Sequence, residues 1–187
     1  MNVTHTELPE VLIVTVDVHA DARGFFFEAY QQRKFASLGI PDCFVQDNHS
    51  HSSKAVLRGL HYQLRNPQGK LVRVVRGEIW DVAVDIRKGS PRFGRWTAAL
   101  LSEDNKRQLY VPPGFAHGFC VLSETADVLY KCTELYAPGD EYGVRWDDPS
   151  IAIEWPPADY RLSEKDRNYP WLRDMESVLP VYRTECE

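Results

Sequence analysis

Hydrophobic and polar residues alternate in short segments along most of the chain, and turn residues separate these segments. Val11–Val18, with the sequence VLIVTVDV, consists mostly of β-branched residues, which favour β-strands. Further segments with the pattern of strands are Phe44–Asn48, Ala55–Gln63, Lys70–Arg76, Glu78–Ile86, Arg92–Leu101, Arg107–Val111, His117–Leu122 and Ala126–Tyr136. Short strands that recur every roughly 8–12 residues are typical of a sandwich or barrel. The pattern therefore predicts a mainly β fold.

Helices are predicted at only two places. Glu28–Leu38 has the composition of a helix, and Gly39 marks its end. Ser163 begins a short helical segment after a proline-rich loop near the C-terminus. We expect residues 1–172 to form a single domain and residues 173–187 to form a loosely held C-terminal tail.

The composition excludes some classes of function. Of the 187 residues, 43% are hydrophobic and 26% are charged, which is ordinary for a globular protein. The formal net charge of -5 argues against a nucleic-acid partner, because nonspecific binding needs a broad basic face. A phosphate-bearing ligand therefore needs a local cluster of cations.

The sequence also indicates a compartment. Its start lacks the basic region and apolar core of a signal peptide, and no apolar run is long enough to predict a membrane span. The four cysteines, Cys43, Cys120, Cys132 and Cys186, form no Cys-x-x-Cys pair, which is typical of reduced thiols. We expect a cytoplasmic protein without a membrane partner.

The segment Leu57–Lys70, LRGLHYQLRNPQGK, places Arg58, His61 and Lys70 in one predicted strand and its following turn. Each of these residues also has a structural interpretation. Arg58 can face solvent, His61 can be a hydrogen-bonded structural histidine, and Lys70 can mark the exposed start of a strand. Strict alternation puts Arg58 and His61 on opposite faces of a strand. If both face one pocket, the backbone must bulge between them, and Gly59 is the residue that permits it.

The segment Val111–Phe119, VPPGFAHGF, places His117 after a tight turn at the start of a strand. This arrangement resembles the second motif of cupin barrels, in which the histidine is often a metal ligand. A metal cupin also needs two histidines separated by one residue, but the segment here is His61-Tyr62-Gln63. Two histidines without further ligands make a poor metal site, so we expect no metal.

Two more residues have both structural and chemical interpretations. Tyr130 interrupts an apolar run, and tyrosine is common in strands as a packing residue. Asp166 follows Ser163 at the spacing of a capping box, in which it satisfies only backbone amides. The alternative is that Asp166 hydrogen-bonds a histidine ring and fixes its tautomer. The spacing does not decide between these two roles.

Motifs along the chain then carry a resemblance to a known family. They are Asp21-x-Arg23-Gly24-Phe25-Phe26-Phe27-Glu28, Gln46-Asp47-Asn48, Leu57-Arg58-Gly59-Leu60-His61-Tyr62-Gln63, Gln68-Gly69-Lys70, Ser90-Pro91-x-Phe93-Gly94, Pro113-Gly114-Phe115-Ala116-His117, Tyr130-Lys131 and Leu162-Ser163-x-Lys165-Asp166. From about residue 3 to 172 the chain resembles the dTDP-4-dehydrorhamnose 3,5-epimerase family. The resemblance implies a jelly-roll, cupin-type β-barrel with short peripheral helices, which forms a homodimer with an N-terminal portion that reaches across.

The resemblance implies an isomerase that needs no cofactor and epimerises a dTDP-4-keto-6-deoxyhexose at carbons 3 and 5. His61 is then the base, Asp166 its partner, and Tyr130 the acid on the opposite face. Lys70, helped by Arg58, stabilises the enolate oxygen. The alternatives are a mono-epimerase that acts at carbon 3 or carbon 5 alone, and a sugar-nucleotide-binding cupin without catalysis.

The resemblance also assigns residues to substrate binding. Aromatic residues at Phe25 and Tyr136 are expected to stack on the thymine. The other residues expected to contact substrate are Arg23, Glu28, Gln46, Asp47, Asn48, Arg58, His117, Glu141 and Lys165.

Overall fold

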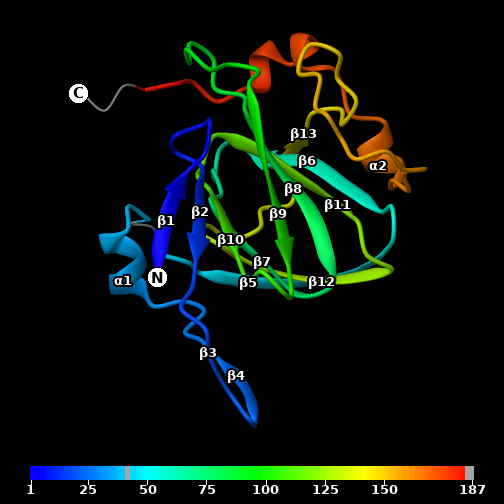
Figure 1. Cartoon of the computed structure of the whole chain (residues 1–187). Helices are drawn as coiled ribbons and strands as arrows, with labels where there is room; N and C mark the ends of the chain where they lie inside the picture. Colours follow the sequence, from blue (N-terminus) through cyan, green and yellow to red (C-terminus); the bar gives the residue numbers. More distant parts are fainter. Residues whose placement is uncertain (41–42, 184–187) are drawn as a thin grey trace.

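The computed structural model describes residues 1–40 and 43–183 of the chain, and two antiparallel sheets packed face to face form its body (Figure 1). The six-stranded sheet has the order β1-β2-β10-β7-β12-β5, with the bounds Asn2–His5, Leu12–Thr15, Gln108–Val111, Lys70–Arg76, Thr125–Cys132 and Gln46–Ser53. The five-stranded sheet has the order β13-β6-β11-β8-β9, with the bounds Glu141–Gly143, Leu57–Gln63, Phe115–Val121, Glu78–Asp85 and Trp96–Ser102. The mainly β jelly roll expected from the sequence is confirmed.

The helices are short and peripheral, as predicted. Helix α1, Gln32–Ser37, is shorter than the predicted segment because Gln31 caps it, with its Oε1 accepting a 2.6 Å hydrogen bond from the N–H of Lys34. Phe35 of this helix is buried against the outer face of the six-stranded sheet. Helix α2 is Glu164–Arg167, and Ser163 caps it.

The interior between the sheets is apolar along much of its length. Alternate residues of the facing strands meet there, as the period of two in a strand requires. The buried residues of this core include Val72, Val74, Ile79, Ala83, Leu101, Leu109, Phe115, Phe119, Val121 and Val128. Strands β5, β6, β7, β11 and β12 also bring polar side chains inward, and these line a pocket described below.

Strand β6 contains the irregularity that the sequence requires. His61 pairs with His117 and Arg58 pairs with Phe119, so β6 advances three residues where β11 advances two. Gly59 lies in this bulge with φ +119°, and a Cβ built there would stand 2.6 Å from the Cα of Gly118. No side chain fits at this position, and the extra residue turns both Arg58 and His61 toward one pocket.

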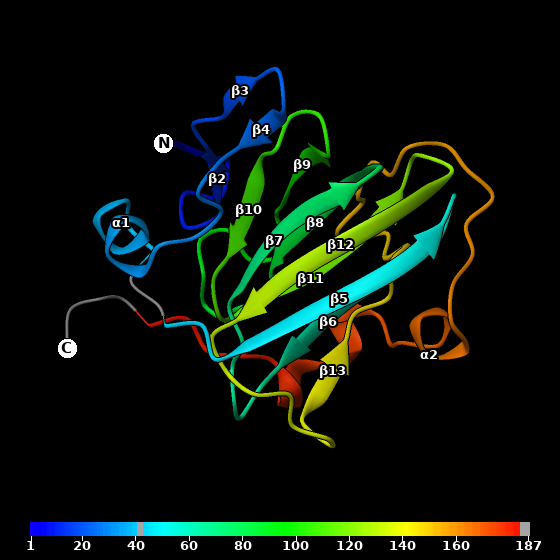
Figure 2. The same ribbon diagram turned by 90° about the horizontal axis from the view of Figure 1, so that it is seen from below.

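An N-terminal hairpin extends away from the body of the molecule. It consists of β3, His19–Asp21, and β4, Gly24–Phe26, which pair with each other as a separate two-stranded sheet (Figures 1 and 2). Phe25 and Phe26 are 60% and 70% exposed at its end. Large aromatic side chains on a projecting element are typical of a surface that another molecule covers.

The C-terminal segment corrects one expectation. The sequence predicts a loosely held tail after residue 172, but Leu172, Met175 and Leu179 are buried against the outer face of the five-stranded sheet. They lie in and beside two short 3₁₀ helices, Leu172–Asp174 and Glu176–Val178. Hydrogen bonds between Lys88 and the backbone near residue 181 extend the attachment. Residues 184–187 of the predicted tail lie outside the described residues, and the division at residue 172 stays a prediction.

None of the helices among the described residues has the length and apolar character needed to cross a membrane.

Candidate active site

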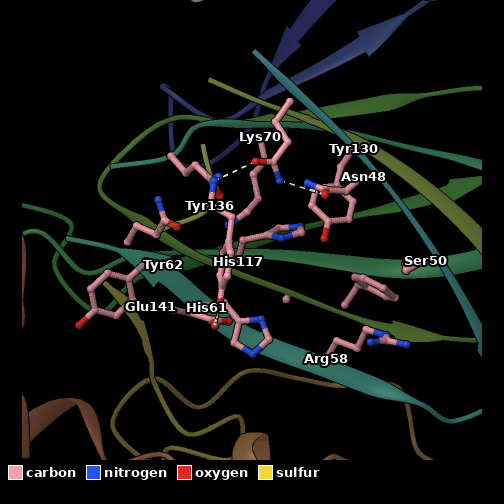
Figure 3. A pocket seen from close by; sticks show the side chains of 15 residues that line it. Asn48, Ser50, Arg58, His61, Tyr62, Lys70, His117, Tyr130, Tyr136 and Glu141 are labelled. Carbon is pink, nitrogen blue, oxygen red and sulfur yellow. Dashed lines mark hydrogen bonds between the residues drawn. The ribbon is translucent and has the colours of Figure 1, made fainter. Parts of the chain in front are cut away.

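A pocket opens between the two sheets, and both sheets contribute side chains to it (Figure 3). Lys70, Tyr130 and Asn48 come from the six-stranded sheet and lie on one side. His61 and Arg58 come from the five-stranded sheet and lie on the other. The lining residues are Gln46, Asn48, Ser50, Arg58, His61, Tyr62, Gln63, Gln68, Lys70, His117, Gly118, Phe119, Tyr130, Tyr136 and Glu141.

His61 is held by a buried carboxylate. Its Nε2 lies 2.6 Å from Oδ1 of Asp166, which is 4% exposed. Burial alone would raise the pKa of Asp166, but the hydrogen bond and charge of His61, together with hydrogen bonds from Ser163 and the backbone of Gly59, outweigh it, and the pKa is lowered. Because an ionised carboxylate only accepts hydrogen bonds, the proton sits on Nε2 and the lone pair of Nδ1 is left for a ligand.

Asp166 also occupies its capping position. Its N–H donates a 3.1 Å hydrogen bond to Oγ of Ser163, so the helix cap and the contact with His61 occur together. Ser163 thus supplies the capping oxygen, and the carboxylate of Asp166 is directed to the histidine. The cap fixes the backbone of α2, and this aims the carboxylate at the histidine.

A second histidine that lines the pocket, His117, also pairs with a carboxylate. Nε2 of His117 is 2.5 Å from Oδ1 of Asp81, which is fully buried. The sequence predicted His117 as a ligand contact but did not single out Asp81 for the site. The signal was a charged residue within the predicted strand Glu78–Ile86, whose neighbours are mostly apolar. His117 and His61 are directly paired neighbours on the adjacent strands β11 and β6.

Lys70 is a cation in a nearly closed environment. It is 8% exposed and forms no ion pair with any residue in the described ranges. Burial lowers the pKa of its ammonium group, and the neighbouring Cys132 offsets only part of this effect. An unpaired buried ammonium is a strong electrostatic partner for any negative charge that develops beside it.

Tyr130 lies on the next strand of the same sheet. Cys132 pairs with Lys70 and Tyr130 pairs with Val72, so Lys70 and Tyr130 both face the interior. Burial raises the pKa of the Tyr130 phenol above its ordinary value. At neutral pH the hydroxyl is therefore protonated and able to donate.

Polar contacts extend from the pocket to its rim. Arg58 donates from Nε to Oγ of Ser52 over 3.0 Å, and its side chain also lines the pocket. Glu141 accepts a 3.1 Å hydrogen bond from the Tyr136 hydroxyl and a 2.5 Å one from Nζ of Lys165, both at Oε2. Burial would raise the pKa of Glu141, but its contacts with Lys165, His61 and Tyr136 together outweigh it and the pKa is lowered.

Four of the predicted binding residues lie away from this pocket. Arg23 and Phe25 are on the projecting hairpin, where Arg23 pairs with Asp21 at 2.6 Å. Glu28 follows the hairpin and pairs with Lys34 at 2.7 Å. Asp47 lies beside a separate pocket, where it pairs with Lys131 at 2.9 Å. The other predicted site residues line the pocket or contact a residue that lines it.

A metal cupin needs a set of metal ligands. In the part of the chain that the structure describes, no group of three or more His, Cys, Asp or Glu is arranged to hold a metal ion. Gln63 stands where a metal cupin has its second histidine, and its side chain binds backbone groups. Its Oε1 accepts from the N–H of Ala137, and its Nε2 donates to the carbonyl oxygens of Asn66 and Leu135. The side chain is thus part of a loop contact.

Comparison with known proteins identifies the same family throughout. The family model described as dTDP-4-dehydrorhamnose 3,5-epimerase matches residues 5–174. The dTDP-4-dehydrorhamnose 3,5-epimerase of Pseudomonas aeruginosa is 55% identical over 169 residues, which cover 89% of this chain and 93% of that protein.

Solved structures give the same result. That of dTDP-6-deoxy-D-glucose-3,5-epimerase from Legionella pneumophila, in complex with dTDP-4-keto-L-rhamnose, has a TM-score of 0.95 at 49% identity and covers 98% of this chain and 99% of that one. The 3'-monoepimerase ChmJ from Streptomyces bikiniensis, in complex with dTDP-quinovose, has a TM-score of 0.90 at 31% identity, with coverages of 97% and 93%.

Proposed function

The chain belongs to the dTDP-4-dehydrorhamnose 3,5-epimerase family, and we propose that it converts dTDP-4-dehydro-6-deoxy-D-glucose to dTDP-4-dehydro-L-rhamnose by epimerisation at carbons 3 and 5. This isomerisation is a step of dTDP-L-rhamnose biosynthesis. One observation supports it above the others: the pair of His61 and Asp166 stands on one wall of the pocket, opposite Tyr130 and Lys70 on the other.

The reaction needs a base and an acid on opposite faces of the sugar. Carbons 3 and 5 both flank the ketone at carbon 4, so removal of either α-proton gives an enolate. We assign the base to Nδ1 of His61, whose other nitrogen is engaged by Asp166. The Tyr130 hydroxyl, which its raised pKa keeps protonated, returns a proton from the opposite wall. Inversion results because the proton leaves from one face and arrives at the other.

The enolate oxygen needs a positive partner, and Lys70 is the candidate. Its ammonium group lies on the same wall as Tyr130 and has no carboxylate partner among the described residues. The developing enolate supplies the missing counter-charge, so the interaction strengthens as the reaction proceeds. Arg58 adds a second cation at the pocket. This charge pattern makes the α-protons removable without a redox step.

The nucleotide is proposed to bind at the rim, where Tyr136 offers an aromatic face. Phe25 is the second expected stacking residue, but it lies on the projecting hairpin. We propose that the enzyme is a homodimer in which this hairpin reaches the pocket of the partner and delivers Arg23 and Phe25. The 60% exposure of Phe25 in a single chain supports that arrangement.

We also propose that the enzyme acts in the cytoplasm. Its described cysteines, Cys43, Cys120 and Cys132, are free thiols, which suits a reducing compartment. Cys186 lies outside the described residues.

Epimerisation at two carbons distinguishes the proposed function from the mono-epimerase alternative. Relatives at about half sequence identity carry the 3,5-epimerase name, whereas the mono-epimerase ChmJ is 31% identical. We expect that incubation with dTDP-4-keto-6-deoxyglucose in heavy water introduces deuterium at both carbon 3 and carbon 5, as NMR would show. Substrate without enzyme gives the background exchange. Enzyme-dependent deuterium at a single carbon would establish the mono-epimerase instead.

Asp166→Asn is expected to lower kcat by about tenfold or more with little change in the affinity for dTDP. An amide in place of the carboxylate can donate to Nε2, which favours the wrong tautomer and moves the proton to Nδ1. Steady-state kinetics and calorimetry with dTDP measure the two effects. A matched control is Asp147→Asn, at an exposed carboxylate that pairs with Arg145 outside the pocket. Full activity of Asp166→Asn would return Asp166 to the role of a helix cap.

A further inference from the structure

The segment 134–137 carries Tyr136 and lies within residues 133–140, which join β12 to β13 without helix or strand. Leu135 and Tyr136 are 58% and 51% exposed, so burial in the core does not fix them. A loop of this kind samples many conformations unless its backbone groups are held by other means. Apart from the hydrogen bond of its hydroxyl to Glu141, the position of the Tyr136 ring therefore depends on what binds the backbone.

Three glutamine side chains hold four consecutive residues of this segment. Nε2 of Gln68 donates to the carbonyl oxygen of Glu134 over 2.6 Å, and Nε2 of Gln63 donates to that of Leu135 over 3.2 Å. The N–H of Tyr136 donates to Oε1 of Gln46 over 2.8 Å. The N–H of Ala137 donates to Oε1 of Gln63 over 2.9 Å. We call Gln46, Gln63 and Gln68 the glutamine clamp.

The glutamine clamp is itself fixed to the rigid part of the site. Gln63 is 5% exposed, and its Nε2 also donates to the carbonyl oxygen of Asn66 over 2.7 Å. Gln46 donates from Nε2 to Oδ1 of Asn48 over 3.0 Å. Asp140, 1% exposed, accepts from the backbone N–H groups of residues 65 and 66 and so ties the two loops together. These hydrogen bonds connect the held segment to the pocket wall.

The same side chains line the reaction pocket. Gln63 lies two residues after His61 on β6, and Gln68 lies two residues before Lys70 at the start of β7. The strand that carries the proposed base therefore also holds the loop that carries the aromatic ring. This connection fixes the distance between the ring on which a nucleobase stacks and the histidine that removes a proton.

We propose that the glutamine clamp is a positioning device that presents Tyr136 to the nucleobase of a nucleoside diphosphate sugar, at a set distance from His61 and Lys70. This inference rests on the proposed function, in which Tyr136 contacts the nucleotide. Without the clamp, only a fraction of molecules holds the ring in place, and the apparent affinity falls by that fraction. The groups that move protons are untouched, so the chemical step continues once substrate is bound.

The expected result is a separation of KM from kcat in Gln63→Met. Methionine has nearly the same shape but makes none of the three backbone hydrogen bonds. We expect KM, and the Kd for dTDP alone measured by calorimetry, to rise about tenfold, while kcat stays within about twofold of wild type. The matched control is Thr6→Val, which removes a hydroxyl that holds the β1–β2 turn far from the pocket. Its KM and kcat are expected to match wild type.

A double-mutant cycle tests whether Gln63 acts through Tyr136. Once Tyr136→Ala has removed the ring, Gln63→Met has nothing left to position, so it is expected to add less than about twofold to KM. If the effects of the two changes on KM multiply, or if Gln63→Met lowers kcat and leaves KM unchanged, the proposal is overturned.

Gln68→Met removes a single hydrogen bond and provides the same cycle if Gln63→Met does not fold. We expect a rise in KM of severalfold that also disappears in the Tyr136→Ala background. The wild-type protein distinguishes a failure of the proposed function from a failure of the glutamine clamp. If wild-type protein neither binds dTDP nor turns over the substrate, the proposed function fails. If wild type does both and neither glutamine variant changes KM, only the glutamine clamp fails.

Discussion

His61→Ala is expected to reduce kcat at least about a hundredfold, while the Kd for dTDP changes by no more than about threefold. A positioned general base contributes roughly 10²–10⁴-fold to a proton transfer. The alanine variant keeps Lys70, Tyr130 and the nucleotide contacts, so the loss is confined to the step in which the α-proton leaves. Turnover of dTDP-4-keto-6-deoxyglucose and calorimetry with dTDP measure the two quantities.

The variant leaves a buried carboxylate without its partner, so folding must be checked by a thermal melt. Loss of the partner of a buried charge costs about 3–5 kcal/mol in typical cases. A second replacement, His61→Asn, keeps an N–H that can reach Asp166 and removes the base alone. His5→Ala, at an exposed histidine outside the pocket, is the matched control and is expected to be fully active. Near-normal turnover by folded His61→Asn would exclude His61 as the base.

The fold was predictable from sequence where strands face the core on at least one side. Segments such as Lys70–Arg76 and Glu78–Ile86 match β7 and β8 to within a residue, because buried alternate positions must be apolar. Strands β1, β3, β4 and β13 were missed. They are short, lie at an edge or outside the main sheets, and bury few side chains. Nothing in a hydrophobic pattern marks a strand that has no buried face.

The candidate site was predictable in part for a related reason. The bulge at Gly59 followed from the alternation rule, because Arg58 and His61 can share a pocket only if the strand has an extra residue. Their meeting with Tyr130 and Asp166 depends on sheet order, which the family resemblance supplied. Asp81 and Gln63 stayed hidden, since their roles depend on which backbone groups and rings the folded chain brings beside them.

The contrast between Tyr130→Phe and Lys70→Ala separates the two faces of the reaction. Tyr130→Phe removes the hydroxyl that returns a proton but leaves His61 able to abstract one. We expect this variant to form epimer about 10²–10⁴-fold more slowly while it still exchanges an α-proton for solvent deuterium through the face of the base. Lys70→Ala should suppress exchange and epimerisation together, because the enolate common to both loses its counter-charge.

Deuterium incorporation into substrate and product, followed by NMR over the same time course, distinguishes these outcomes. Both variants retain the rim contacts of Tyr136, Glu141 and Lys165, so the Kd for dTDP serves as an internal control. The two variants differ in exchange because the acid acts after the enolate has formed, whereas the cation acts while it forms. Normal epimerisation by Tyr130→Phe would remove the acid from the opposite wall. Exchange by Lys70→Ala at the wild-type rate would show that another group, with Arg58 the nearest candidate, carries the charge of the enolate.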